Sequence, residues 1–246
     1  MRIALTSAFA AALVIASAAA ANAQDIVQQV RQQRDGTLNV LFASKPGVCG
    51  DGRGSISMHA EDNHHWGYCE PGPVRLSLTI AAGAVTKLRT YVGGEIKQPA
   101  ITVSAPAAVS YLLSLAETAR PEIARHAIFP ALLADSVEPW PRLLNLARNQ
   151  QIDRAVRKSA IFWLGQGAGE KATAGLKSML TDEDLEVRKS AVFALSQLKG
   201  DAGVVALIDV VKNSKDPEVR KNALFWLGQK NDPRVLAMFE DILLRN

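Results

Sequence analysis

Charge of one sign is concentrated nowhere in the sequence. Its 28 lysines and arginines and 24 aspartates and glutamates are interspersed along the chain, which leaves a net charge of +4. Proteins that bind nucleic acid usually gather Lys and Arg on one stripe. We therefore expect no nucleic acid among the partners of this protein.

Catalytic motifs are also missing. The chain contains neither the G-x-S-x-G pattern of a nucleophilic serine nor the H-E-x-x-H pattern of zinc peptidases. The glycine-rich run at 50–54 lacks the lysine of a phosphate-binding loop, so we interpret it as a turn. His126 occupies a helix position typical of semi-exposed residues. A triad can still assemble in space, but we predict no enzyme and no cofactor.

Long apolar runs are absent except at the start of the chain. A positively charged start precedes an apolar, alanine-rich stretch at 3–20, and Ala21-Asn22-Ala23 forms a small-x-small site. This pattern is typical of a secretory signal peptide at 1–23. A membrane anchor is the alternative, and no later run is long enough to span a bilayer. We expect an exported bacterial protein, periplasmic or secreted, without membrane contact after cleavage.

Cysteine is scarce, since Cys49 and Cys69 are the only two. An oxidising compartment favours a disulfide between them. It would close a loop of about 20 residues, worth ~3 kcal/mol in the chain-entropy model. Because the same loop is rich in histidine, a zinc site is the alternative, with His59, His64 and His65 as candidate ligands. No C-x-x-C or H-x-x-x-H spacing supports it, and we predict no metal.

Two regions follow the signal peptide, and the first, 24–104, has the patterns of a small β-rich domain. Alternating apolar and polar residues have a period of two, which is typical of strands with one buried face. A turn at 81–83 predicts a hairpin. The expected elements are, in chain order, a short helix at 25–34 and strands at 38–43, 74–80, 85–92 and 101–103.

The second region, 105–246, repeats itself. The motif Val-Arg-Lys-Ser/Asn-Ala occurs three times and ends at Ala160, Ala191 and Ala223, which gives a period of 31 to 32 residues. A degenerate earlier copy ends at Ala127. A repeat of this length predicts hairpins of two helices that bury their apolar faces only against neighbouring hairpins. The fold class is therefore α+β, with a C-terminal α-solenoid of about four hairpins.

The repeat predicts where each unit begins. An aspartate stands four residues before the arginine of each motif and suits the N-cap of the first helix. The second helices are expected at 140–149, 171–180, 202–213 and 233–245. The Asp-x-x-Val-Arg-x-x-Ala-x-x-x-Leu pattern of these units resembles HEAT-like repeats, of the short type named after phycobilisome lyases, over roughly 121–246.

This resemblance implies a binding scaffold. In HEAT-like repeats, the Asp and the Arg of the motif form ladders between units, which implies a structural role for Asp153, Arg157, Asp184, Arg188, Asp216 and Arg220. The whole chain resembles uncharacterised exported bacterial HEAT-repeat proteins, which offer no activity to carry over. The lyase activity does not transfer, because bilin attachment is an intracellular task.

The second helices of HEAT-like stacks line the concave face, so their polar residues are candidates for partner binding. These are Arg142, Asn145, Arg148, Lys177, Asp209, Lys212 and Glu240. Trp163 and Trp226 occupy equivalent positions and indicate either an aromatic patch for a partner or packing between units.

The sequence favours an exported scaffold that binds another protein through its solenoid. One alternative is a small metal- or ligand-binding N-terminal domain that the solenoid supports, which elemental analysis would test. A further alternative is self-assembly through the ends of the stack.

Overall fold

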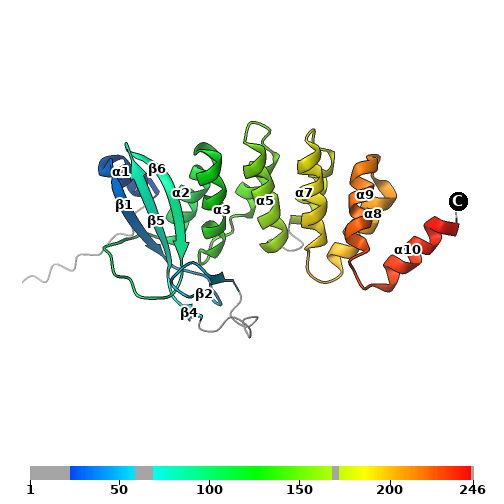
Figure 1. The fold of residues 1–246 in the computed structure, drawn as a ribbon, viewed down its shortest axis with the longest axis horizontal. Helices are drawn as coiled ribbons and strands as arrows, with labels where there is room; N and C mark the ends of the chain where they lie inside the picture. Colours follow the sequence, from blue (N-terminus) through cyan, green and yellow to red (C-terminus); the bar gives the residue numbers. More distant parts are fainter. Residues whose placement is uncertain (1–22, 59–68, 168–171, 245–246) are drawn as a thin grey trace, which may run out of the picture.

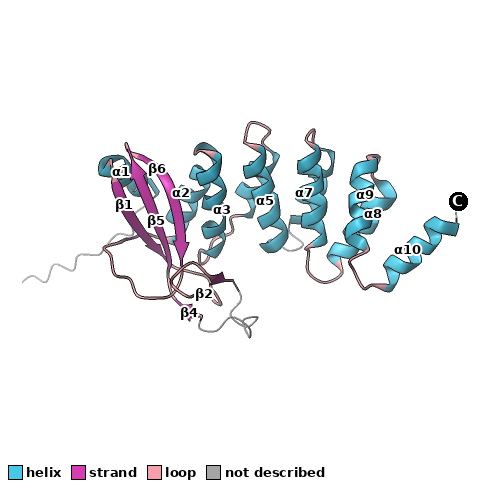
Figure 2. Cartoon of the chain, in the orientation of Figure 1, coloured by secondary structure: helices cyan, strands magenta, loops and turns pink. Residues whose placement is uncertain are grey.

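The strands lie at one end of the molecule, and the helices form a row that leads away from them to the C-terminus (Figure 1). The structure is a computed structural model that describes residues 23–58, 69–167 and 172–244. Figure 2 shows that the strands are confined to the N-terminal part, as the sequence predicts. Within the described ranges, no helix is long and apolar enough to cross a membrane.

The main sheet has four strands in the order β6-β5-β1-β7. They are β1 (Gly36–Phe42), β5 (Val74–Ala81), β6 (Ala84–Tyr91) and β7 (Ile101–Thr102). β1 and β6 both run antiparallel to β5, whereas β7 pairs in parallel with β1. The register places apolar residues opposite one another on the buried face, as in Val40 opposite Leu76. This confirms the period-two pattern as the origin of the sheet.

The turn between β5 and β6 is a tight two-residue connection. Ala82 and Gly83 both have positive φ, +51° and +75°, which is the backbone of a type I′ hairpin turn. Alanine rarely adopts this conformation. The Ala82 N–H donates to Asp35 Oδ1 at 3.1 Å, and the Gly83 N–H donates to the Arg34 carbonyl at 2.7 Å. These bonds from the preceding loop help hold the turn.

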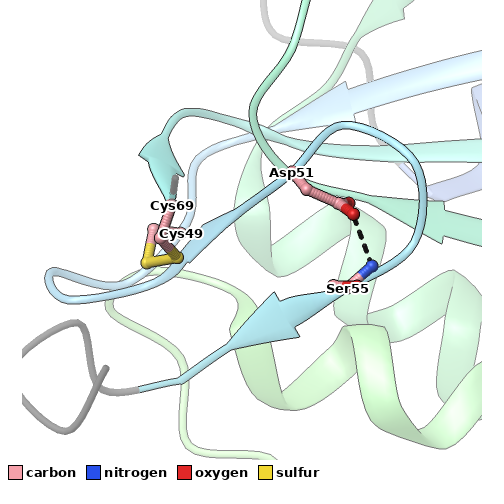
Figure 3. The surroundings of a disulfide bond; sticks show 4 residues. All are labelled: Cys49, Asp51, Ser55 and Cys69. Atoms are coloured by element: carbon pink, nitrogen blue, oxygen red, sulfur yellow. Dashed lines mark hydrogen bonds between the residues drawn. A yellow bond between two sulfur atoms is a disulfide. The ribbon is translucent and has the colours of Figure 1, made fainter. Parts of the chain in front are cut away.

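A second, three-stranded sheet lies below the first in Figure 1 and contains the disulfide. Its strands are β2 (Cys49–Gly50), β3 (Ile56–Ser57) and β4 (Glu70–Pro71), in the order β3-β2-β4. Cys49 and Cys69 are joined with their Cα atoms 5.3 Å apart, which confirms the predicted disulfide (Figure 3).

The glycine-rich run is a site of close backbone packing. A Cβ at Gly50 would lie 2.5 Å from the Val92 carbonyl oxygen, and one at Gly93 would lie 2.5 Å from the Gly50 carbonyl oxygen. Two chain segments therefore cross here with no room for side chains. Three successive N–H groups, of Arg53, Gly54 and Ser55, donate to Asp51 Oδ1 at 2.8 to 3.0 Å. The chain's own carboxylate thus occupies the donors that a phosphate would need.

Helices make up most of the described chain after the sheets, and one helix precedes them. They are α1 (Ala23–Gln33), α2 (Ala105–Thr118), α3 (Pro121–Leu133), α4 (Trp140–Arg148), α5 (Arg154–Gly167), α6 (Thr173–Ser178) with the 3-10 turn η3 (Met179–Thr181), α7 (Leu185–Ser196), α8 (Ala202–Asn213), α9 (Pro217–Leu227) and α10 (Pro233–Leu244). The predicted first helices are α3, α5, α7 and α9, and the predicted second helices are α4, α6, α8 and α10. The repeat therefore predicts the helix order along the stack.

The pairing of helices into hairpins differs from the expected one. The second helices α4, α6 and α8 each pack more extensively against the first helix of the next unit than against the first helix of their own unit. A short connection accounts for the pairing of α8 with α9, whereas the five residues 149–153 join α4 to α5. Only residues 119–120 join α2 to α3 and only 214–216 join α8 to α9, and short connections force neighbouring helices together. Hairpins thus begin at α2, and α10 is left as a terminal helix.

The sheet and the stack share one apolar core. Buried side chains form a single cluster from Ile26 in α1 to Met238 in α10. Helices α1 and α3 contact the sheet directly, and α2 packs against both of them. The first helices pack closely along the row, because a Cβ at Gly165 would lie 2.8 Å from the Ala194 carbonyl oxygen of α7. The regions predicted as 24–104 and 105–246 are therefore joined through a continuous interior.

Candidate functional site

The histidine cluster lies outside the described residues. His59, His64 and His65 all fall in the segment 59–68. Within the described ranges, no group of three or more His, Cys, Asp or Glu residues is placed to hold a metal ion. The zinc alternative therefore stays a prediction. The two cysteines at the ends of the histidine-rich loop, Cys49 and Cys69, are joined to each other.

The motif Asp and Arg residues contact neighbouring units, but not in one uniform ladder. Arg188 Nε lies 2.8 Å from Asp216 Oδ2 of the next unit. Arg157 instead pairs with Asp182, two residues before the motif aspartate, and Asp184 pairs with Arg154. Each motif aspartate also accepts a backbone N–H of its own helix, from Ala155, Glu186 and Glu218.

In the described part of the chain, the first aspartate and the last arginine of these motifs do not pair with another motif residue. Asp153 has no arginine to meet in the first unit, because Ala124 stands at that position. Within the described residues, Arg220 meets no further motif aspartate and donates to the Ser214 carbonyl oxygen at 2.7 Å. Both exceptions therefore lie at an end of the described row of motifs.

Most charged candidates on the second helices are occupied by bonds between helices. Arg142 donates to Glu117 at 2.8 Å, and Lys177 Nζ lies 2.6 Å from Asp209 Oδ2. Arg148 donates to Ser178 Oγ at 2.9 Å. Arg148 is exposed despite this bond, and the exposed candidates without such a bond in the described chain are Asn145, Lys212 and Glu240. The paired residues link units to each other, which leaves less of this face for a partner.

The first helices carry an aromatic row, which we define as Phe129, Phe162, Trp163, Phe193, Phe225 and Trp226. Phe occurs at the same position of every unit. The rings touch across units, with centroids 4.7 Å apart for Phe129 and Trp163 and 4.9 Å apart for Phe193 and Trp226. Such pairs stabilise packing by about 0.5–1.5 kcal/mol each. Both tryptophans therefore take part in packing between units.

The aromatic row is also accessible. Phe162 is 37% exposed and Phe225 is 57% exposed, and both tryptophans are half-buried. Aromatic side chains that are rigid and partly exposed are typical of protein interfaces. The row therefore offers an aromatic contact surface on the first helices, whereas the second helices present charged side chains.

An open cleft of about 1070 Å³ lies where the sheet meets this row. One wall is made by the end of β6 and by the turn at residues 51–55, which we call the Asp51 turn. This wall includes Arg53, Arg89 and Tyr91. The other wall is made by α3 and α5. Its lining residues there are Arg125, His126, Phe129, Ala155, Lys158, Ser159 and Trp163. We call this site the basic cleft.

The charges of the basic cleft are largely uncompensated. Arg53, Arg89 and Arg125 form no ion pair within the part of the chain that the structure describes. Lys158 pairs with Glu186 at 3.2 Å, and that pair is exposed. The backbone N–H groups of Arg53, Gly54 and Ser55 bond to Asp51 and hold the turn that presents Arg53. The same bonds, that of Arg53 most of all, lower the pKa of Asp51. The cleft thus combines positive charge with aromatic surface.

Sequence reasoning missed most of this site, although one signal was present. Arg125 and Lys158 stand at equivalent positions of successive units, followed by Lys189 and Lys221. The repeat therefore places a positively charged side chain at the same position of each first helix. Arg53 and Arg89 come from other elements and carry no pattern of their own. Of the residues of the basic cleft, only Trp163 was among the predicted site residues.

The fold defines the helical part of the chain as an α-solenoid. Residues 141–213 match the family model for HEAT repeats, a segment that begins in α4 and ends with α8. No curated protein matches the chain. The chain is therefore similar to HEAT-repeat proteins, which commonly serve as scaffolds for protein interaction.

Proposed function

We propose that this protein is an exported HEAT-repeat scaffold that binds another protein and has no catalytic activity of its own. The basic cleft is the observation that carries the proposal. It brings three arginines without ion pairs in the described chain together with Phe129 and Trp163. Arginine and aromatic residues dominate binding energy at protein interfaces. The partner is expected to contact the cleft and the adjoining aromatic row.

The second helices are a weaker candidate surface. Their strongest charges already meet one another, and breaking such pairs for a partner would cost part of the binding energy gained. The exposed residues Asn145, Lys212 and Glu240 remain available there. A variant on this face therefore serves as a comparison for the cleft.

The binding surface is tested with immobilised mature protein and a periplasmic extract. We expect that the double variant Arg89→Glu/Arg125→Glu loses the captured partner, while Lys212→Glu and Lys221→Glu retain it. Lys221 is a matched control, because it occupies the repeat position of Arg125 on α9, outside the cleft. Capture that survives in the double variant would exclude the cleft. Loss with Lys212→Glu alone would favour the second helices.

Export is tested separately. The alanine-rich start and the small-x-small site support cleavage after Ala23. N-terminal sequencing of protein recovered from the periplasm or the medium should then read from Gln24. Recovery of the intact chain from the cytoplasm would contradict export, without affecting the argument for the cleft.

A further inference from the structure

One wall of the basic cleft is the edge of a sheet. β6 ends the strand order, and in the described part of the chain its only strand partner is β5. Four consecutive residues of β6, from Leu88 to Tyr91, line the cleft. The outer N–H and C=O groups of an edge strand are a template for a further strand. The cleft therefore offers backbone donors and acceptors in addition to side chains.

The edge is guarded against pairing with a second copy of itself. Lys87 and Arg89 are exposed on β6, and like charges directly opposite each other destabilise a strand pair. Cations on an edge strand are a common protection against self-association. The same cations favour an incoming strand that carries carboxylates. The positive charge of β6 therefore favours an acidic partner strand over a second copy of β6.

The opposite wall suits the side chains of such a strand. Arg125 and Lys158 add positive charge, and Phe129 and Trp163 add apolar surface. Side chains of a strand alternate between its two faces with a period of two. The face of an added strand that turns toward α3 and α5 would therefore place apolar groups against the aromatic rings. Its other face would lie beside the exposed Arg89, so acidic residues at the alternate positions would present carboxylates to that cation.

We propose that an extended acidic segment of the protein partner adds to the free edge of β6 as a fifth strand of the main sheet. This inference rests on the proposed function, because it specifies how the partner occupies the basic cleft. Strand addition gives affinity through main-chain hydrogen bonds and specificity through side-chain contacts. A single-stranded nucleic acid also suits positive charge and aromatic rings, but it lacks the peptide groups that complement a strand edge.

The probe for this proposal is a fluorescein-labelled peptide of eight residues in which Glu alternates with Val or Phe. Two matched peptides carry N-methyl groups on alternate amides, one on the Glu residues and the other on the apolar residues. Only every second residue of an added strand directs its N–H and C=O groups toward β6. We expect one methylated peptide to bind like the parent and the other at least about tenfold more weakly, because its strand hydrogen bonds are lost.

Protein variants complete the test by fluorescence anisotropy on the mature chain from Gln24. The substitution Arg125→Glu should weaken the parent peptide by about tenfold or more, since it reverses a charge on the cleft wall. The substitution Lys221→Glu changes the net charge equally and should leave binding unchanged. Hydrogen exchange should also show new protection of β6 amides in the complex.

The outcomes separate this inference from the proposed function. If both methylated peptides bind like the parent, strand addition is wrong, whereas the cleft as a protein-binding site stands. If no peptide binds but Arg89→Glu/Arg125→Glu abolishes capture of the natural partner, strand addition is again wrong and the cleft again stands as a protein-binding site. If oligodeoxythymidylate binds more tightly than the peptides and Arg125→Glu abolishes this binding, both proposals are wrong.

Discussion

At the scale of single residues, Arg157 makes the most demanding interaction in the described chain. Its side chain is only 5% exposed and that of its partner Asp182 only 8%. Arg157 Nε also donates to the Ala147 carbonyl oxygen at 2.9 Å, which ties α5 to α4. Truncating one partner of a buried ion pair leaves the other charge unpaired, which costs about 3–5 kcal/mol. We expect Arg157→Ala to lower the free energy of unfolding by that amount in urea titrations.

The neighbouring residue provides the control. Lys158 pairs with Glu186, but both side chains are more than a third exposed. Exposed ion pairs contribute about 0–1 kcal/mol, so Lys158→Ala should change the free energy of unfolding by no more than that. Equal effects of the two substitutions would contradict the role assigned to burial.

A second prediction concerns the hydroxyl group of Tyr111. Its oxygen is buried and has no hydrogen-bond partner among the described residues, and burial raises the pKa of the phenol. A buried polar group without a partner destabilises the folded state by about 1–3 kcal/mol. Tyr111→Phe should therefore leave the free energy of unfolding unchanged or raise it. A clear loss of stability in urea titrations would mean that the hydroxyl group is in fact bonded.

At the scale of elements, the contact between first helices depends on a missing side chain. A Cβ at Gly165 would lie 2.8 Å from the Ala194 carbonyl oxygen and 2.9 Å from its Cα, so Gly165→Ala forces α5 and α7 apart. Overpacking of this kind costs about 1–3 kcal/mol. We expect a fall of that size in the free energy of unfolding, measured by urea titration.

Gly228 offers a matched comparison at the same repeat position. It ends α9, against which no further first helix packs in the described part of the chain, and the nearest atoms to an added Cβ are 3.5 Å away. Its φ of −61° suits alanine. Gly228→Ala should therefore be neutral, or stabilising by about 0.4–1 kcal/mol through a less flexible unfolded chain. If both substitutions were neutral, the first helices would not be held at the observed distance.

The elements themselves were largely predictable, whereas their pairing was not. Hydrophobic periods of two and 3.6 fix the type of β5, β6 and the helices, because they reflect which face of a single element is buried. Which two helices form a hairpin depends instead on whether α4 packs against α3 or α5, and this is decided by connections and packing. The parallel pairing of the two-residue β7 with β1 likewise has no local signal.

At the scale of the whole molecule, the basic cleft is a product of assembly. Its cations come from the Asp51 turn, β6, α3 and α5, which lie far apart in the sequence. Each is an ordinary surface residue when considered alone. The repeat carried part of the information, since it places Arg125 and Lys158 on one face. The position of the sheet beside that face is set by the shared core, which no single segment encodes.

The charges that join successive units give the whole stack a dependence on pH. The hydrogen bond from Lys177 lowers the pKa of Asp209, and those from Arg234 lower the pKa of Asp232 to about 2. Burial acts to raise the pKa of Asp216, but backbone N–H groups and Arg188 outweigh it and lower the value. Arg188 and Lys177 each belong to the unit preceding the aspartate that they contact. Protonation of Asp209 or Asp216 therefore weakens a link along the row of helices, whereas Asp232 pairs with Arg234 of the same segment.

The sign of the effect follows from which state holds more protons. The unfolded chain binds protons at these aspartates near their ordinary pKa of 3.8, while the folded chain resists binding until the pH is lower. The stabilisation is thus present above that pKa and is lost as the pH falls below it, through the lower pKa of the folded state. We expect the urea midpoint of Asp209→Asn/Asp216→Asn to fall less steeply across this range than that of the native chain. Asparagine keeps the N-cap of α9, so the change isolates charge. The exposed Glu240→Gln serves as the control, and an unchanged slope in the double variant would show that other groups govern acid unfolding.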